Sequence, residues 1–219
     1  MTLAKVTKLM RAPFSNKIVA FARQYWRLKT YLIYRPMFKH MGRNSVIFSP
    51  MIINNSDCIE IGDEVTIRNG IRLEAIRDPF GRIPSLVIGS NTNIEQNVHI
   101  ICHSSVQIGR DVSITGRCAI VDTTHPYEDI CAGKIGDLIA NDDSFVEIGD
   151  GAFLGYGVVV LPNVRIGRRA VIGANSVVTR DVPDFSVAAG APARIIKVYS
   201  RELGRWVAYD KTETQGEGG

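Results

Sequence analysis

The sequence predicts a mainly β solenoid built from triangular coils of short parallel strands. An amphipathic helix precedes the coils, a long excursion loop leaves them, and a short helix follows them. The prediction rests on a six-residue repeat, on the places where that repeat loses its phase, and on two ends that lack it. Repeats of fixed period are the signature of solenoid architectures.

The repeat is clearest from Ile148, where the chain reads IGDGAF, LGYGVV, VLPNVR, IGRRAV, IGANSV, VTRDVP. An aliphatic residue opens each hexad, and the same phase appears from Ile61, Ile88 and Ile108. Three hexads close one coil, with the opening residue pointing inward and glycine relieving the corner. Strands of successive coils then pair in parallel along the axis.

Breaks in the phase predict where loops leave the coils. The spacing from Leu73 to Ile88 is 15 residues, and that from Ile120 to Ile148 is 28, so neither is a multiple of six. A short loop is expected in the first gap. The second gap contains residues 125–144, a long loop of the kind that usually serves function.

The charge of the chain is unevenly distributed. Hydrophobic residues are 45% and charged residues 22% of the 219, which excludes wholesale disorder and a transmembrane protein. Residues 1–43 contain ten Lys or Arg and no Asp or Glu, whereas the other 176 hold 16 basic and 22 acidic residues. The basic front is expected either to contact an anionic membrane surface or to cap the first coil. Nucleic acid is not expected, because no aromatic platform is interleaved with the charges.

Three parts of the chain are expected: a basic helical segment over 1–43, a β-helix domain over 44–198, and a short helix with a flexible tail over 199–219. Apolar spacing within residues 15–34 predicts one or two amphipathic helices, with Ser15 as the N-cap.

The cysteines and the first residues indicate the compartment. Cys58, Cys102, Cys118 and Cys131 form no C-x-x-C pair, and residues 1–15 lack the apolar core of a secretory signal. Reduced thiols in a cytoplasmic protein are therefore expected. Contact of residues 1–43 with the inner face of the cytoplasmic membrane would make that protein peripheral.

Three stretches carry a resemblance: Thr124-His125-Pro126, IGDGAFLGYGVVVLPNVRIG, and VIGANSVVTRDVPDFSVAAGAPARIIK. With the hexads, they resemble the left-handed parallel β-helix acyltransferases over residues 46–197. The resemblance is closest to galactoside/maltose acetyltransferases and bacterial polysaccharide O-acetyltransferases. It implies acetyl-CoA as donor, an alcohol or amine as acceptor, and a homotrimer with active sites at subunit interfaces.

The resemblance also implies roles for particular positions, with His125 as the general base. The positions expected to contact the coenzyme are Gly155, Tyr156, Ala174, Thr179, Arg194 and Lys197. The residues expected at the acceptor are Glu95, Asn97, Asp122 and Phe153.

Some of these positions depart from the sugar enzymes or leave alternatives open. Phe153 replaces a Trp, and Glu95 falls where the galactoside enzymes have an Asn, so galactose or maltose is not favoured as acceptor. Asp122 could orient the imidazole, bind the acceptor or be a solvated turn residue. Glu95 could bind the acceptor, stabilise a charged His125 or lie at an exposed coil corner.

The expected chemistry is direct attack of an acceptor hydroxyl on the thioester, with histidine removing the proton. A backbone N–H near Gly155 is expected to stabilise the oxyanion. His99 and His103 do not match the three-histidine zinc site of the β-helix carbonic anhydrases, so no metal is expected. Cys102 is expected to be a buried thiol.

The sequence therefore predicts an acetyl-CoA-dependent O-acetyltransferase acting on a sugar hydroxyl, with a cell-surface polysaccharide (capsule or O-antigen) precursor as the acceptor. The alternatives are an acetyltransferase for a xenobiotic or a nucleotide-linked amino sugar, and a non-catalytic β-helix scaffold. A scaffold would keep the hexads but would not need His125 or the excursion loop.

Overall fold

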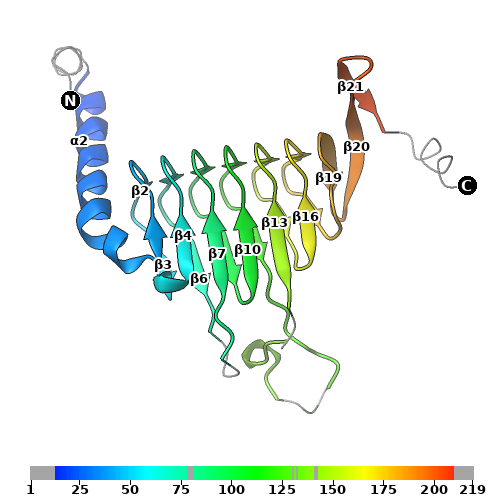
Figure 1. Ribbon diagram of the computed structural model, residues 1–219, viewed down its shortest axis with the longest axis horizontal. Helices are drawn as coiled ribbons and strands as arrows, with labels where there is room; N and C mark the ends of the chain where they lie inside the picture. Colours follow the sequence, from blue (N-terminus) through cyan, green and yellow to red (C-terminus); the bar gives the residue numbers. More distant parts are fainter. Residues whose placement is uncertain (1–12, 78–80, 130, 132, 141–142, 210–219) are drawn as a thin grey trace, which may run out of the picture.

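The computed structural model describes residues 13–77, 81–129, 131, 133–140 and 143–209. Its body is a prism of stacked coils with three parallel sheets as faces (Figure 1). Sheet A consists of β1 (His40–Met41), β4 (Ile59–Ile61), β7 (Ser85–Ile88), β10 (Ser105–Ile108), β13 (Phe145–Ile148) and β16 (Val164–Ile166). Sheet C consists of β3 (Ile52–Asn54), β6 (Arg72–Ala75), β9 (His99–Cys102), β12 (Ala119–Val121), β15 (Val159–Val160) and β18 (Val177–Val178).

Sheet B forms the third face and extends past the last coil. Its parallel strands are β2 (Val46–Ile47), β5 (Thr66–Ile67), β8 (Asn93–Ile94), β11 (Ser113–Ile114), β14 (Phe153–Leu154), β17 (Val171–Ile172) and β19 (Ser186–Gly190). The antiparallel strands β20 (Ala193–Ser200) and β21 (Arg205–Ala208) complete the sheet.

The core is the interior of the prism, and the predicted hexads fill it. The residues that open the six hexads from Ile148 are 0–2% exposed: Ile148, Leu154, Val160, Ile166, Ile172 and Val178. Register places equivalent residues of successive coils side by side, as Ile88, Ile108 and Ile148 are in sheet A. The aliphatic positions therefore form continuous buried columns, which supply most of the hydrophobic stabilisation.

The predicted N-terminal helix is present, but it starts before the predicted cap. Helix α2 (Phe14–Lys29) follows Pro13, whose carbonyl accepts N–H groups from Asn16 and Lys17, so Ser15 is inside the helix. A π-helical turn (Thr30–Tyr34) and a 3-10 turn (Arg35–Met37) lead to the first coil. That coil begins at β1, because His40–Met41 pairs with β4, which is earlier than the predicted boundary at 44.

The predicted C-terminal helix is wrong. Residues 193–208 form the β20–β21 hairpin, in which the rings of Tyr199 and Trp206 pack 5.6 Å apart. Aromatic and β-branched cross-strand pairs favour strands, and the open edge of β19 supplies backbone partners for β20. The predicted flexible tail lies outside the described residues from position 210.

Two loops leave the prism where sheet C leads into sheet A, as the phase breaks predicted. One connects β6 to β7 over residues 76–84, and the other connects β12 to β13 over residues 122–144. Both extend from the same side of the prism (Figure 1). Two further 3-10 turns are Ser56–Cys58 and Ile135–Asp137, the second within the longer loop. We call the turns from sheet C to sheet A the C–A corner, and the turns from sheet B to sheet C the B–C corner.

Candidate active site

His125 lies near the start of the excursion loop, and its imidazole is held by one hydrogen bond. Its Nδ1 lies 2.6 Å from the carbonyl oxygen of Leu138, on the returning arm of the loop, and the side chain is exposed. A carbonyl can only accept, so Nδ1 carries the proton and Nε2 keeps its lone pair. The loop therefore fixes the tautomer that a general base requires.

Contacts at its base hold the excursion loop closed on itself. The N–H of Ala140 donates to the carbonyl of Thr124 at 3.0 Å, which joins the two arms beside His125. Arg82, on the loop between β6 and β7, pairs with Asp143 at 3.0 Å. The two loops of the C–A corner are thus linked next to the histidine.

Asp122 is not available to an acceptor. It is fully buried, and its carboxylate accepts the backbone N–H groups of His103, Ser104 and Ser105 at 2.6, 2.8 and 2.8 Å. Its burial excludes a solvated turn residue and a residue that binds the acceptor. Its carboxylate is used by the three N–H groups, and among the described residues no hydrogen bond joins it to the imidazole of His125. Asp122 instead anchors the turn formed by residues 103–105 of the preceding coil, beside the point where the chain enters the excursion loop.

Cys102 is inert in this environment, as expected of a buried thiol. Burial raises the pKa of the Cys102 thiol far above its ordinary value, and the charge of Asp122 adds to this effect. A thiol that stays protonated is a poor nucleophile. Among the described cysteines, Cys58, Cys102 and Cys118 are buried and free, and Cys131 is exposed and free.

The predicted acceptor residues Glu95 and Asn97 gather at the B–C corner, away from His125. Glu95 is half-buried and pairs with Arg68 at 3.7 Å, and Asn97, two residues later, is exposed. Phe153, on the outer side of β14, is 42% exposed, and Tyr156 at the following turn is 46% exposed. Two exposed rings and a carboxylate thus line this side of the prism.

Gly155 is a packing residue, and its own N–H is not a free oxyanion donor. That N–H donates to the carbonyl of Ile172 at 2.8 Å as part of the ladder between coils. A Cβ at position 155 would lie 2.6 Å from the backbone nitrogen of Ala174. Glycine is required because adjacent coils approach closely here, and the predicted oxyanion donor near Gly155 would have to be a neighbouring N–H.

The remaining predicted coenzyme residues lie toward the C-terminal end of the prism. Ala174 is exposed at the B–C corner, and Thr179 is exposed after β18. Arg194 and Lys197 are exposed on β20, and among the described residues the guanidinium of Arg194 donates to the neighbouring Ala193 carbonyl. Both cations are therefore available to anionic groups.

The two groups of predicted residues lie at different corners of one chain. Glu95 and Asn97 precede β9, whereas His125 follows β12, which pairs with β9 in sheet C. A four-residue strand such as β9 spans about 13 Å at ~3.3 Å per residue. A general base must lie within about 3 Å of the hydroxyl that it deprotonates. One chain therefore does not bring His125 and these acceptor residues together.

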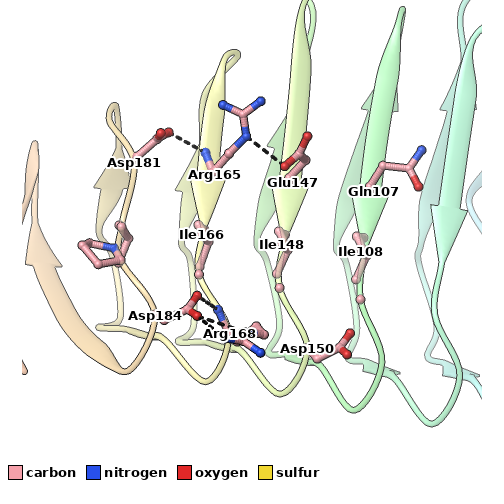
Figure 2. Close-up of a pocket in the computed structure, with 15 residues that line it drawn as sticks. Gln107, Ile108, Glu147, Ile148, Asp150, Arg165, Ile166, Arg168, Asp181 and Asp184 are labelled. Carbon is pink, nitrogen blue, oxygen red and sulfur yellow. Dashed lines mark hydrogen bonds and ion pairs between the residues drawn. The ribbon is translucent and has the colours of Figure 1, made fainter. Parts of the chain in front are cut away.

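A groove of about 590 Å³ contains none of the predicted site residues. It runs along sheet A over a floor that includes Ile108, Ile148 and Ile166 (Figure 2). Arg165 donates to Glu147 at 2.9 Å through its side chain and to Asp181 at 2.7 Å through its N–H. Arg165 is thus bonded to two carboxylates, and Arg168 is paired with Asp184 at 2.8 Å. The charged side chains of the groove therefore bond successive coils to one another.

The structure also bears on metal ions and membrane spans. Within the described ranges, no group of three or more His, Cys, Asp or Glu is placed to hold a metal ion. Over the same residues, no helix is long and apolar enough to cross a membrane.

The hydrogen-bond acceptor that fixes His125 was missed by sequence reasoning, because the backbone carbonyl of Leu138 leaves no signal in the residue types.

Comparison with known proteins defines the class. Residues 145–180 match the family model described as bacterial transferase hexapeptide (six repeats). The chain is 37% identical over 166 residues to the Escherichia coli protein WbbJ, which is provisionally named a lipopolysaccharide biosynthesis O-acetyl transferase. That match covers 74% of this chain and 82% of WbbJ. The chain therefore belongs to the bacterial hexapeptide-repeat transferase family, and the predicted enzyme class, an acetyltransferase, is confirmed.

Two further matches agree with this assignment. The galactoside O-acetyltransferase of Escherichia coli is 35% identical over 113 residues, which is 50% of this chain and 52% of that enzyme. The hexapeptide-repeat acetyltransferase VCA0836 of Vibrio cholerae, solved with acetyl-CoA, superimposes with a TM-score of 0.53 at 23% identity. The superposition covers 86% of this chain and 91% of the VCA0836 chain, and it confirms the predicted left-handed parallel β-helix fold.

Proposed function

We propose that this acetyltransferase moves an acetyl group from acetyl-CoA to a sugar hydroxyl of a cell-surface polysaccharide precursor. The observation that carries the proposal is the hydrogen bond from His125 Nδ1 to the Leu138 carbonyl, which leaves Nε2 free as a base. The similarity to WbbJ, which spans most of both chains, supports a glycan as the acceptor.

In the proposed reaction, Nε2 of His125 removes the proton of the acceptor hydroxyl as its oxygen attacks the thioester carbonyl. The tetrahedral intermediate then collapses, the C–S bond breaks, and the thiolate of CoA takes the proton from the imidazolium. The Leu138 carbonyl stabilises the imidazolium while it lasts. No acyl-enzyme is formed, because the acceptor attacks the donor directly.

The exposed residues on sheets B and C supply a path for the coenzyme. The pantetheine arm follows Tyr156 and Ala174 at the B–C corner, and in the trimer it meets Thr179 at the C–A corner of the adjoining copy. The CoA phosphates meet Arg194 and Lys197, whose charges suit phosphate oxygens. Phe153 and Glu95 lie beside the start of this path and are placed to contact the acceptor.

A complete site then needs two copies of the chain. His125 and the residues at the B–C corner lie at opposite ends of the strands of sheet C, which are about 13 Å apart by the length of one strand. A cyclic homotrimer joins the C–A corner of one copy to the B–C corner of the next and builds three equal sites. We place this trimer in the cytoplasm, where acetyl-CoA and glycan precursors meet, and peripherally at the membrane.

The test is acetyl transfer by His125→Ala. We expect the rate to fall by about 10²–10⁴-fold, the usual contribution of a general base, with CoA binding and assembly unchanged. The matched control is His99→Ala on β9, which removes a half-buried histidine from sheet C and not from the excursion loop. Full transfer by His125→Ala, or equal losses in both variants, would refute the assignment. A parallel assay with amino-sugar acceptors separates O- from N-acetyl transfer.

A further inference from the structure

Helix α2 carries an apolar stripe that the protein leaves in water. Its six side chains recur every three or four residues, which places them on one face of the helix. All are more than half exposed, and no residue of α2 is buried. The stripe consists of Phe14 (78%), Ile18 (54%), Phe21 (78%), Tyr25 (53%), Leu28 (58%) and Leu32 (60%), the last in the π-helical turn.

A different side of the helix attaches α2 to the prism. The ring of Trp26 packs 6.4 Å from that of Phe48, and the hydroxyl of Thr30 accepts from the N–H of Ile47 at 3.0 Å. At ~100° per residue, Trp26 and Thr30 lie about 120–160° around the helix from the stripe. The helix stands at the N-terminal end of the prism and extends beyond the first coil (Figure 1). The chain's own body therefore leaves the stripe uncovered.

The charge around the stripe indicates what covers it. The sequence has no Asp or Glu before Asp57, and α2 itself carries Lys17, Arg23, Arg27 and Lys29. None of the ion pairs among the described residues uses these four cations, although the Lys29 ammonium lies 4.9 Å from the centre of the Trp26 ring. At ~100° per residue, Lys17 and Lys29 flank the stripe, whereas Arg23 and Arg27 lie on the opposite side of the helix. Packing the stripe on a second copy would add another such helix without any balancing acid. An anionic lipid surface buries the stripe and brings negative charge to the two lysines at its edges.

We propose that α2 is an interfacial anchor that lies flat on an anionic lipid leaflet. The apolar stripe enters the boundary between headgroups and acyl chains, and Lys17 and Lys29 at its edges meet lipid phosphates. This anchor gives the peripheral location a structural basis, and its purpose rests on the proposed function, in which the acceptor is a glycan precursor at the membrane. The anchor would hold the coils beside lipid-linked substrates.

The test is flotation of the full chain with phosphatidylcholine vesicles that contain or lack phosphatidylglycerol. We expect binding only to the anionic vesicles. Phe21→Ser with Leu28→Ser should weaken that binding on the order of 100-fold, from the apolar burial lost at two side chains. The control, Asn16→Ser with Gln24→Ser, makes two uncharged changes off the stripe and should stay within about twofold of the unmodified chain.

Two results would overturn the anchor: no flotation of the unmodified chain with anionic vesicles, or equal flotation of the stripe and control variants. If the stripe variant also changes the sedimentation of the protein without lipid, a second copy covers the stripe instead. Acetyl transfer to a lipid-free acceptor is measured separately and should be unchanged in the stripe variant. A chain that floats but transfers nothing would contradict the proposed function and leave the anchor standing.

Discussion

Replacing Asp122 with alanine removes the carboxylate that holds the turn beneath the excursion loop. Three backbone N–H groups, those of His103, Ser104 and Ser105, donate to it at 2.6–2.8 Å inside the prism. Each buried donor left without an acceptor costs about 1–3 kcal/mol, so the three together cost at least about 3 kcal/mol. Asp122→Asn keeps one oxygen and should lose less than the alanine variant.

Thermal unfolding of the full chain measures this loss. For a chain of this size, about 3 kcal/mol corresponds to a fall in Tm of roughly 6–12 °C. The control is Asp137→Ala in the excursion loop, which breaks an exposed pair with Lys134 and should cost less than about 1 kcal/mol. An Asp122→Ala variant that melts with the control would show that the buried carboxylate does not hold the corner.

Two further predictions concern the stacking of the coils. Gly155→Ala should lower stability by about 1–3 kcal/mol in urea unfolding, since the new Cβ meets the backbone of the next coil; Gly136→Ala, with 4.0 Å of clearance, should be near neutral, and equal effects would refute the close-packing argument. Hydrogen bonds from the backbone N–H groups of Arg43, Arg110 and Arg168 lower the pKa of the carboxyl groups that accept them, Asp63, Asp150 and Asp184. The unfolded pKa is about 3.9, so this stabilisation is complete above about pH 4 and is lost as pH falls through the lower folded values. Melting followed from pH 7 to about 2 should show that loss, smaller when all three are Asn, and identical profiles would contradict it.

The fold was largely predictable because each hexad carries its own burial pattern. The opening aliphatic residue of every hexad from Ile148 lies inside the prism, so the hydrophobic pattern of the sequence matches the burial pattern of the coils. The C-terminal hairpin was not predictable in the same way. Residues 193–208 become strands because β19 offers an open edge, and a window of a dozen residues contains no information about that edge.

The candidate site was predictable only where a side chain carries the chemistry. His125 could be located because it lies where a coil ends and a long loop begins. The Leu138 carbonyl that fixes its tautomer, and the ladder bond that occupies the Gly155 N–H, involve backbone atoms and leave no trace in residue type. Asp122 was placed near the site, but its burial depends on the turn of the preceding coil, residues 103–105, whose N–H groups it accepts.

Mixing two inactive variants tests the central claim, a His125 base completed by a second copy. One variant carries His125→Ala, and the other carries Arg194→Ala with Lys197→Ala. In equal mixed assembly of a cyclic trimer, about a quarter of the interfaces join an intact histidine to an intact coenzyme path. Acetyl transfer by the whole mixture should recover to about a quarter of the unmodified rate, while each variant alone stays inactive. Mixed trimers with no recovered transfer would show that each copy holds its own site, and would contradict the account.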